Sequence, residues 1–304
     1  STLIMYWSQV RILAGPPFKK MKIAISGILP FSGLIKEGFQ ILGHTVSNEN
    51  PDLIYANDPR GYIEAISLKK KYPKIKMIFN LLDIPWFMPN ILNQTKMLVS
   101  NYLNQADAIS VLSEKVKKDL SRFSDREIHV IYNPVRDVYH DESIKKENDF
   151  LFVGRANDPN KRFSLIKESL TKIKDGEKKM IVCGSENPGF GNYLGYVSDK
   201  KLNQLYNSTK YLLLPSKYEG IGLPMIEALI CGSFPITCTD NETAKEFLPL
   251  DFMCKPNAES IIKHIKDLES NYKIRREMAL KLGQEYKEKF NKTKIAMNIL
   301  SILK

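Results

Sequence analysis

Short apolar runs alternate with longer helix-like stretches along most of the chain, and this alternation constrains the fold more than any other feature. Between residues 21 and 140 the expected strands are Lys22–Ser26, Asp52–Ala56, Ile75–Leu81, Ala106–Leu112 and Ile128–Tyr132. Several of these runs are apolar throughout, as strands covered on both faces of a sheet are. Strand–helix alternation predicts a parallel sheet with helices on both sides. We therefore expect an α/β domain over residues 21–140.

The alternation restarts after a polar segment, residues 141–149, which we expect to be a linker. The second series of expected strands is Phe150–Val153, Met180–Cys183, Tyr211–Leu214 and Phe234–Thr237. These strands predict a second α/β domain over residues 150–290, with 241–247 among its helices. A final helix over residues 291–304 is expected to pack back on the first domain. Parallel sheets bind ligands beyond the carboxyl ends of their strands, so the expected site lies between the domains.

The formal net charge of +11 raises the question of nucleic-acid binding. Residues 21–149 contribute only +1 of this charge, while residues 150–304 contribute +7 on what read as amphipathic helices. The sequence has neither an RNA-binding aromatic signature nor a helix-turn-helix pattern. We therefore expect a solvated basic face and no nucleic-acid partner. Weak peripheral contact with an anionic membrane is the alternative.

The cysteines and the apolar runs indicate a cytoplasmic protein, peripheral at most at the inner face of a membrane. Cys183, Cys231, Cys238 and Cys254 lie in apolar segments without a C-x-x-C pair, which predicts buried reduced thiols. No run approaches the roughly 20 apolar residues of a membrane-spanning helix. Residues 1–20 lack a hydrophobic period. We expect them to be a disordered or non-native extension before a natural start at Met21, or else an apolar arm for a membrane or partner.

The most informative segment is Leu212–Pro235. An apolar strand runs into a turn with Glu219, and a helix is expected to begin near Gly222, Leu223 and Pro224, since proline is favoured in a first helical turn. The free N–H groups of Gly222 and Leu223 would form a phosphate site at the positive end of that helix. Glu227 could then accept hydrogen bonds from two ribose hydroxyls, with Glu219 reaching beyond the phosphates. On spacing alone, both carboxylates could equally be ordinary loop and helix-surface groups.

A second candidate group follows the first strand of the second domain, where Leu151–Arg155 is followed by Lys161. Two fixed cations at this place would neutralise a diphosphate leaving group, Arg155 by bidentate hydrogen bonds and Lys161 as a point charge. The alternative is exposed charge on a loop.

The string P-S-x-x-E-G-x-G-L-P-x-x-E-A-L-x-x-G-x-x-P, from Pro215 to Pro235, and the FVGR-x5-K segment resemble the retaining glycosyltransferases of family 4 (glycosyl transferases group 1). The resemblance implies the GT-B fold, which is α/β with two Rossmann-like domains facing a central cleft. It also implies sugar transfer, with retention of configuration, from a UDP- or GDP-sugar to a glycan, lipid-linked or small-molecule acceptor, as in cell-envelope polysaccharide or glycan biosynthesis. Arg155 and Lys161 would contact the donor pyrophosphate, Glu227 the ribose and Glu219 the sugar.

The resemblance implies further site residues, some of them at departures from the family pattern. Val197 lies in a loop like the one that flanks the nucleotide base. Relatives often have two glycines in the first loop, where this chain has only Gly33. Relatives often have His-Asp where this chain has Leu82-Asp83, which leaves Asp83 as the catalytic partner of the sugar or acceptor. No D-x-D triplet is present, so no metal is expected, because Arg155 and Lys161 would do its work.

Two other classes of function share parts of this pattern. A nucleotide-sugar 2-epimerase would use the same fold with a donor site and no acceptor groove, and the paired glutamates argue against it. A non-catalytic sugar-nucleotide binder or a nucleic-acid-binding protein would not need all of Arg155, Lys161, Glu219 and Glu227.

Overall fold

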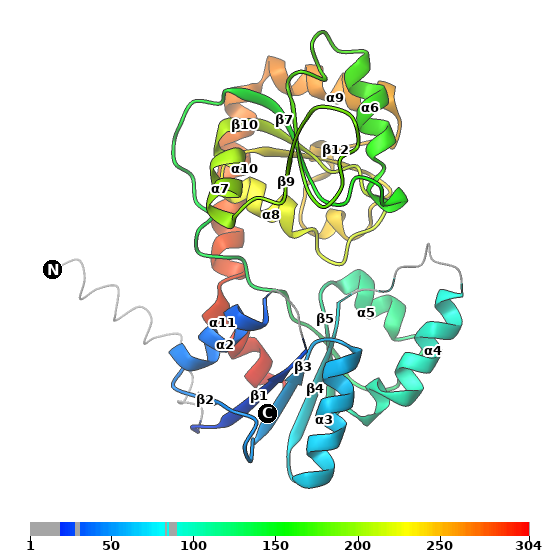
Figure 1. The fold of residues 1–304 in the computed structure, drawn as a ribbon, viewed down its shortest axis with the longest axis vertical. Coiled ribbons are helices and arrows are strands. Elements are labelled where there is room, and N and C mark those ends of the chain that lie inside the picture. Colours follow the sequence, from blue (N-terminus) through cyan, green and yellow to red (C-terminus); the bar gives the residue numbers. More distant parts are fainter. Residues whose placement is uncertain (1–18, 28–30, 83, 85–89, 304) are drawn as a thin grey trace, which may run out of the picture.

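Two parallel sheets organise the computed structural model, which describes residues 19–27, 31–82, 84 and 90–303 (Figure 1). The first sheet has the order β2-β1-β3-β4-β5-β6 and the second the order β12-β11-β10-β7-β8-β9. Every strand pair in both sheets is parallel. The predicted fold class of two parallel α/β sheets is confirmed. The strands are β1 (Lys22–Ser26), β2 (Thr45–Val46), β3 (Leu53–Ala56), β4 (Lys76–Leu81), β5 (Ala108–Val111), β6 (Ile128–Val130), β7 (Asn148–Val153), β8 (Met180–Cys183), β9 (Asn192–Gly195), β10 (Thr209–Leu213), β11 (Phe234–Cys238) and β12 (Met253–Cys254).

Helices connect the strands and cover the sheets. They are α2 (Ser32–Ile41), α3 (Pro59–Lys71), α4 (Ile91–Asn101), α5 (Glu114–Leu120), α6 (Phe163–Thr171), α7 (Asp199–Ser208), α8 (Leu223–Ile230), α9 (Ala258–Ser270), α10 (Tyr272–Lys289) and α11 (Lys292–Ser301). Several begin where a short polar side chain accepts a hydrogen bond from the first turn, as Asp58 does from Gly61 and Ser198 from Lys201. Such caps satisfy N–H groups that have no partner inside the helix.

The three strands that the sequence did not predict are β2, β9 and β12, and all three lie at sheet edges. Strands β2 and β12 have two residues each, and β9 is only partly covered. Central strands such as β3 and β5 are buried along their whole length and therefore read as apolar runs. Edge strands this short or this exposed have no such pattern.

The expectation of a helix over residues 241–247 is wrong. This segment holds only one 3₁₀ turn, η3 (Ala244–Glu246). The side chain of Asn241 accepts a hydrogen bond from the Ala244 N–H and donates one to the Ser216 carbonyl. Because an asparagine side chain can bond nearby backbone in this way, it competes with helical hydrogen bonding.

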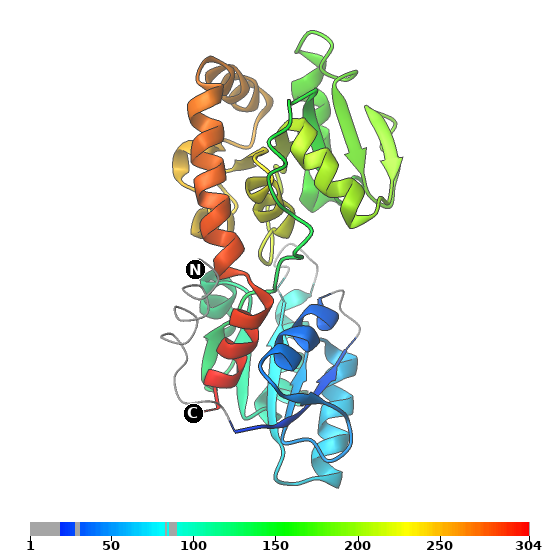
Figure 2. The ribbon, with the colours of Figure 1, turned by 90° about the vertical axis from the view of Figure 1, so that its left-hand side faces the viewer.

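The chain passes between the domains twice, and the two crossings are joined. Residues 131–147 make the first crossing without regular secondary structure. Strand β7 begins at Asn148 and therefore includes the last two residues of the expected linker. The second crossing is the bend between α10, which runs along the second domain, and α11, which lies on the first (Figure 2). The Val135 N–H donates to the Phe290 carbonyl at 3.0 Å and ties the crossings together.

Helix α11 packs into the core of the first domain. Its buried Ile295, Ala296 and Ile299 share a hydrophobic cluster with Ile35 and Phe39 of α2. The two helices approach closely, because a Cβ atom at Gly38 would collide with the carbonyl oxygen of Lys292.

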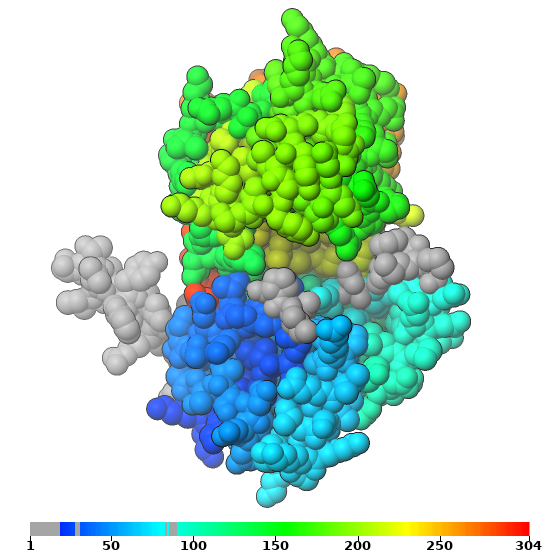
Figure 3. Space-filling model, in the orientation of Figure 1, coloured from blue at the N-terminus to red at the C-terminus, as the bar shows by residue number. Residues whose placement is uncertain are grey.

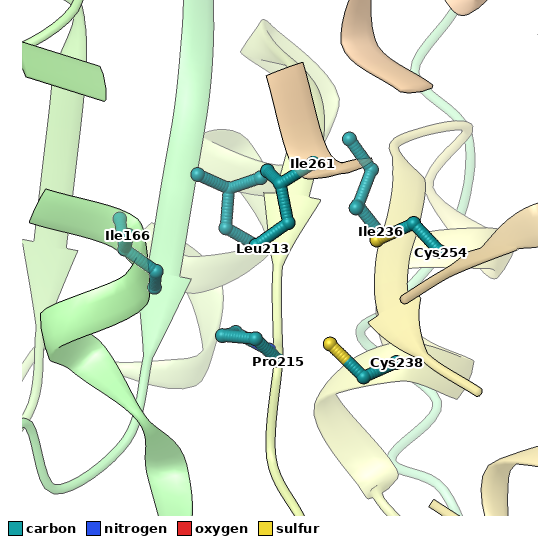
Figure 4. Close-up of a pocket in the computed structure, with 7 residues that line it drawn as sticks. All are labelled: Ile166, Leu213, Pro215, Ile236, Cys238, Cys254 and Ile261. Carbon is teal, nitrogen blue, oxygen red and sulfur yellow. The ribbon is translucent and has the colours of Figure 1, made fainter. Parts of the chain in front are cut away.

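The four cysteines are buried free thiols, as the sequence predicted. Two of them, Cys238 and Cys254, are partners in register on β11 and β12. With apolar side chains around them, they line a gap in the second core that has no room for a water molecule (Figure 4). This gap is part of the packed interior.

Among the helices of the described residues, none combines the length and the apolar character needed to cross a bilayer.

Candidate active site at the domain interface

The two carboxylates of the Leu212–Pro235 segment lie on either side of the start of α8, as the sequence suggested. Strand β10 leads into a loop that carries Glu219, and α8 follows with Glu227 in its second turn. Gly222 precedes the helix with a φ of +73°, a backbone conformation that favours glycine. Within the part of the chain that the structure describes, no side chain caps α8. Its first N–H groups are the feature that binds anions at helix N-termini.

Glu219 forms an ion pair with Lys161. The Nζ atom of Lys161 lies 2.6 Å from Oε1 of Glu219, and the two side chains are only 15% and 14% exposed. Lys161 ends the short 3₁₀ turn η2 (Pro159–Lys161), which follows β7. Strands β7 and β10 are neighbours in the sheet, and this brings the two sequence-distant groups together at its carboxyl edge.

Arg155 lies close to this pair in the chain but is more open to solvent. Its side chain is 67% exposed, and its guanidinium donates to Oδ2 of Asp158 at 2.7 Å. Asp158 also accepts a hydrogen bond from the Asn160 N–H, which shapes the η2 turn. The arginine is thus tethered at one end of the loop that ends in Lys161.

Glu227 is buried, with only 6% exposure, and is not a helix-surface residue. The Tyr206 hydroxyl donates a hydrogen bond to its Oε2 at 3.1 Å. Burial raises the pKa of Glu227 to about 7, against the lowering effects of the Tyr206 hydrogen bond and of Arg136. Sequence analysis did not identify Tyr206 as a partner of Glu227, because the two residues lie on different helices, α7 and α8.

Gly33 lies in the first turn of α2 and lines a cavity of about 500 Å³. A Cβ atom at Gly33 would meet no other atom within 4 Å, so the neighbouring space is open. The cavity is lined mostly by polar groups of the first domain, together with Ile25 and Val46; the polar residues are Ser32, Lys36, Ser47 and Asn48.

Two predicted site residues remain, Val197 and Asp83, and the structure describes the first of them. Val197 is half-buried, packs against the second core and directly precedes Ser198, the N-cap of α7. Asp83 lies outside the described residues. Its neighbour Ile84 is described, and the Ile84 N–H donates to the Tyr218 hydroxyl at 3.0 Å. This bond joins the first domain to the loop that carries Glu219.

A second contact crosses between the domains beside this loop. The carboxylate of Glu246, in η3, accepts hydrogen bonds from the Glu114 and Lys115 N–H groups at 2.9 and 2.8 Å. A second-domain carboxylate therefore caps the N-terminus of α5 in the first domain, where negative charge is favourable. Figure 3 shows the surface hollowed where the two domains meet.

No cluster of three or more His, Cys, Asp or Glu side chains that could hold a metal ion occurs within residues 19–27, 31–82, 84 and 90–303.

Comparison with known proteins is consistent with this geometry. Residues 137–287 match the family model of the glycosyl transferases group 1. The chain is 33% identical over 106 residues to O-antigen chain mannosyltransferase B of Escherichia coli, covering 34% of this chain and 28% of that protein. It is 26% identical over 184 residues to O-antigen chain mannosyltransferase RfbU of Salmonella typhimurium, covering 54% and 52%. The matches therefore span between about a quarter and a half of these relatives' lengths.

Solved structures resemble 90% or more of the chain. HepE from Anabaena, in complex with UDP and glucose, has a TM-score of 0.73 at 15% identity, covering 93% of this chain and 99% of its own. Sucrose-phosphate synthase from Thermosynechococcus elongatus has a TM-score of 0.70 at 16% identity, covering 90% and 76%. At such identities the likeness establishes the fold. The chain thus has the two-domain GT-B fold, and its residues 137–287 match the family model of the glycosyl transferases group 1.

Proposed function

We propose that this protein transfers a sugar from a nucleotide-diphosphate sugar to a glycan, lipid-linked or small-molecule acceptor, with retention of anomeric configuration. The observation that carries the proposal is the Glu219–Lys161 pair, at 2.6 Å, beside the uncapped start of α8. A carboxylate for the sugar, a cation for the leaving group and a helix N-terminus for phosphate are thus adjacent. The products would be the glycosylated acceptor, the nucleoside diphosphate and a proton.

The chemistry would depend on electrostatic stabilisation of the departing diphosphate. Lys161, Arg155 and the N–H groups of Gly222 and Leu223 would face the charge that develops as the sugar–phosphate bond breaks. Because these cations would do the work of a metal ion, we propose that the reaction requires no metal ion. Activity that survives chelation by EDTA would support this point, and activity restored only by added divalent ions would contradict it.

Glu227 would anchor the nucleotide. Its buried carboxylate accepts from Tyr206 and has a second oxygen to offer to ribose hydroxyls. Val197, ahead of the α7 cap, would flank the base. Both UDP- and GDP-sugars remain candidate donors: HepE was solved with UDP and glucose, and two relatives are O-antigen mannosyltransferases.

The first-domain cavity near Gly33 would receive the acceptor or the far side of the donor. Its volume of about 500 Å³ is that of an ordinary small-molecule site. Hydroxyl, amide and ammonium groups line it, and they suit sugar hydroxyls. Asp83 would supply the carboxylate next to the reacting sugar. We also propose a cytoplasmic location with weak attraction to an anionic membrane, to be tested by sedimentation with vesicles at rising salt.

The test is a panel of UDP- and GDP-sugars offered with oligosaccharide and lipid-linked acceptors, with release of UDP or GDP as the signal. NMR of the product would determine its anomeric configuration, and inversion would contradict retention. Conversion of the donor itself, without release of a nucleoside diphosphate, would indicate an epimerase. The Glu219→Gln variant should lose at least about 10²-fold in rate if the carboxylate acts in the transition state.

A further inference from the structure

Asn160 holds the backbone that leads into Glu219. It lies in η2 and is only 9% exposed. Its side-chain Oδ1 accepts from the Tyr218 N–H at 3.0 Å, and its Nδ2 donates to the Tyr218 carbonyl at 2.8 Å. Its own carbonyl accepts from the Lys217 N–H at 2.9 Å. Three hydrogen bonds from one residue thus fix two consecutive residues of the loop.

We propose that Asn160 is a positioning residue that fixes the Glu219 carboxylate relative to Lys161. This inference rests on the proposed sugar transfer. Asn160 directly precedes Lys161, and Tyr218 directly precedes Glu219. Both members of the 2.6 Å ion pair therefore extend from backbones that are clamped to each other one residue away.

The clamp limits how far the carboxylate can move. A residue whose N–H and C=O are both held has little freedom to rotate, so the side chain that follows it keeps its direction. Tyr218 adds a third restraint, because its hydroxyl accepts from Ile84 across the domain interface. Catalytic geometry is sensitive to such restraints, since a displacement of about 1 Å can lower a rate by about 10²-fold.

A merely structural amide in the same domain provides a matched control. Asn207 is 1% exposed and clamps another segment in the same way. Its Nδ2 donates to the His140 carbonyl at 2.9 Å, and its Oδ1 accepts from the Glu142 N–H at 2.7 Å. Asn207→Ala should therefore lose comparable hydrogen bonding and lower Tm, without touching the Glu219 loop.

The experiment compares Asn160→Ala and Asn207→Ala in the full chain. The donor is the nucleotide sugar that the panel above identifies by release of UDP or GDP. At saturating concentrations of this donor, Asn160→Ala should lower kcat by about 10- to 10²-fold. Its Kd for UDP or GDP should stay within about threefold of the wild-type value, because Asn160 does not hold Glu227 or the start of α8. The η2 turn that carries Lys161 also keeps the hydrogen bond from the Lys161 N–H to the Asp158 carbonyl. Asn207→Ala should show a similar fall in Tm with kcat within about threefold of wild type.

Hydrogen exchange supplies a readout that needs no substrate. Peptides covering residues 215–221 should lose protection in Asn160→Ala and keep it in Asn207→Ala. Wild-type kcat in Asn160→Ala, or equal rate losses in both variants, would overturn the inference. If the wild-type protein turns over no donor, the proposed function fails, and the positioning role of Asn160 in sugar transfer fails with it. Unchanged exchange in residues 215–221 would show that Asn160 does not hold the loop, whatever the activity.

Discussion

Among single residues, Glu227 couples stability to pH through the burial of its carboxyl group. Burial raises its pKa to about 7, from 4.5 in an unstructured chain. Between these values the unfolded chain has released a proton that the native protein still holds, so the free energy of unfolding falls as pH rises. Glu227 contributes roughly 3 kcal/mol to the free energy of unfolding. This contribution is fully present below pH 4.5 and is lost above about pH 7.

We therefore expect Tm to fall between pH 4.5 and about pH 7, with a shallower slope in Glu227→Gln. The variant cannot ionise, so its native state keeps the favourable neutral form at every pH. Glu177→Gln removes an exposed carboxylate from the same domain and should retain the wild-type slope. Parallel Tm curves for wild type and Glu227→Gln would show that this carboxylate does not titrate in the range.

Arg162 offers a second test at this scale, because its backbone adopts a conformation that favours glycine. Its φ of +49° lies in the left-handed region that glycine adopts freely. The arginine occupies it with both guanidinium NH₂ nitrogens bonded to Asp240, at 2.9 and 2.5 Å. Arg162→Gly loses the ion pair but relieves the backbone, whereas Arg162→Ala loses the pair and keeps the strain.

Urea unfolding should therefore place Arg162→Ala below Arg162→Gly by about 1 kcal/mol in stability. Asp240→Ala, which removes the same ion pair but leaves the arginine backbone strained, should resemble Arg162→Ala. An alanine variant as stable as the glycine variant would mean that the left-handed conformation is not maintained.

Among the elements, α8 and α10 depend on a close approach at Gly283. A Cβ atom there would collide with the carbonyl oxygen of Leu229, in the last turn of α8. Gly283→Ala should therefore push the helices apart and destabilise the protein by about 2 kcal/mol or more, although alanine favours a helix. Because Glu227 is on α8, UDP or GDP binding should weaken as well.

Gly33→Ala is the contrasting change. It also places alanine in a helix, where a Cβ atom meets open space. Its Tm should stay equal or rise, while turnover falls if a ligand approaches α2 at this point. Equal losses of stability in the two variants would contradict the packing at Gly283.

The same elements show how far sequence can lead. The apolar runs of β3 and β5 predicted the first sheet because burial on both faces leaves a readable pattern. Two-residue edge strands such as β2 leave none. In the site, Glu219 and Lys161 were each identified, but their contact was not, because they are 58 residues apart and strand order alone brings them together. Asn160 was not identified, since its role depends on the shape of a loop.

For the whole molecule, Glu246 links the two domains by capping α5 with two hydrogen bonds. Each hydrogen bond to a charged group of this kind contributes about 1.5–3 kcal/mol to stability, and this is lost when the carboxylate is removed. Glu246→Ala should widen the range of domain arrangements, seen as a larger radius of gyration by small-angle X-ray scattering, and should slow turnover several-fold. Glu242→Ala removes a nearby carboxylate that pairs within its own domain, with Lys245, and should change neither. Identical scattering for Glu246→Ala and wild type would show that the cap does not hold the domains.

The packing of α11 against α2 determines the order in which the protein can mature on the ribosome. The α2 face that includes Ile35 and Phe39 emerges early, yet the residues that cover it, such as Ile295 and Ile299, are made only after the second domain. The second domain should therefore complete its fold while the first still exposes an apolar stripe that a nascent-chain chaperone could bind. A released chain that is truncated after residue 290 should be cut by protease within residues 21–130 and spared within 150–280. Equal resistance of both halves in that truncated chain would mean that the first domain folds without α11.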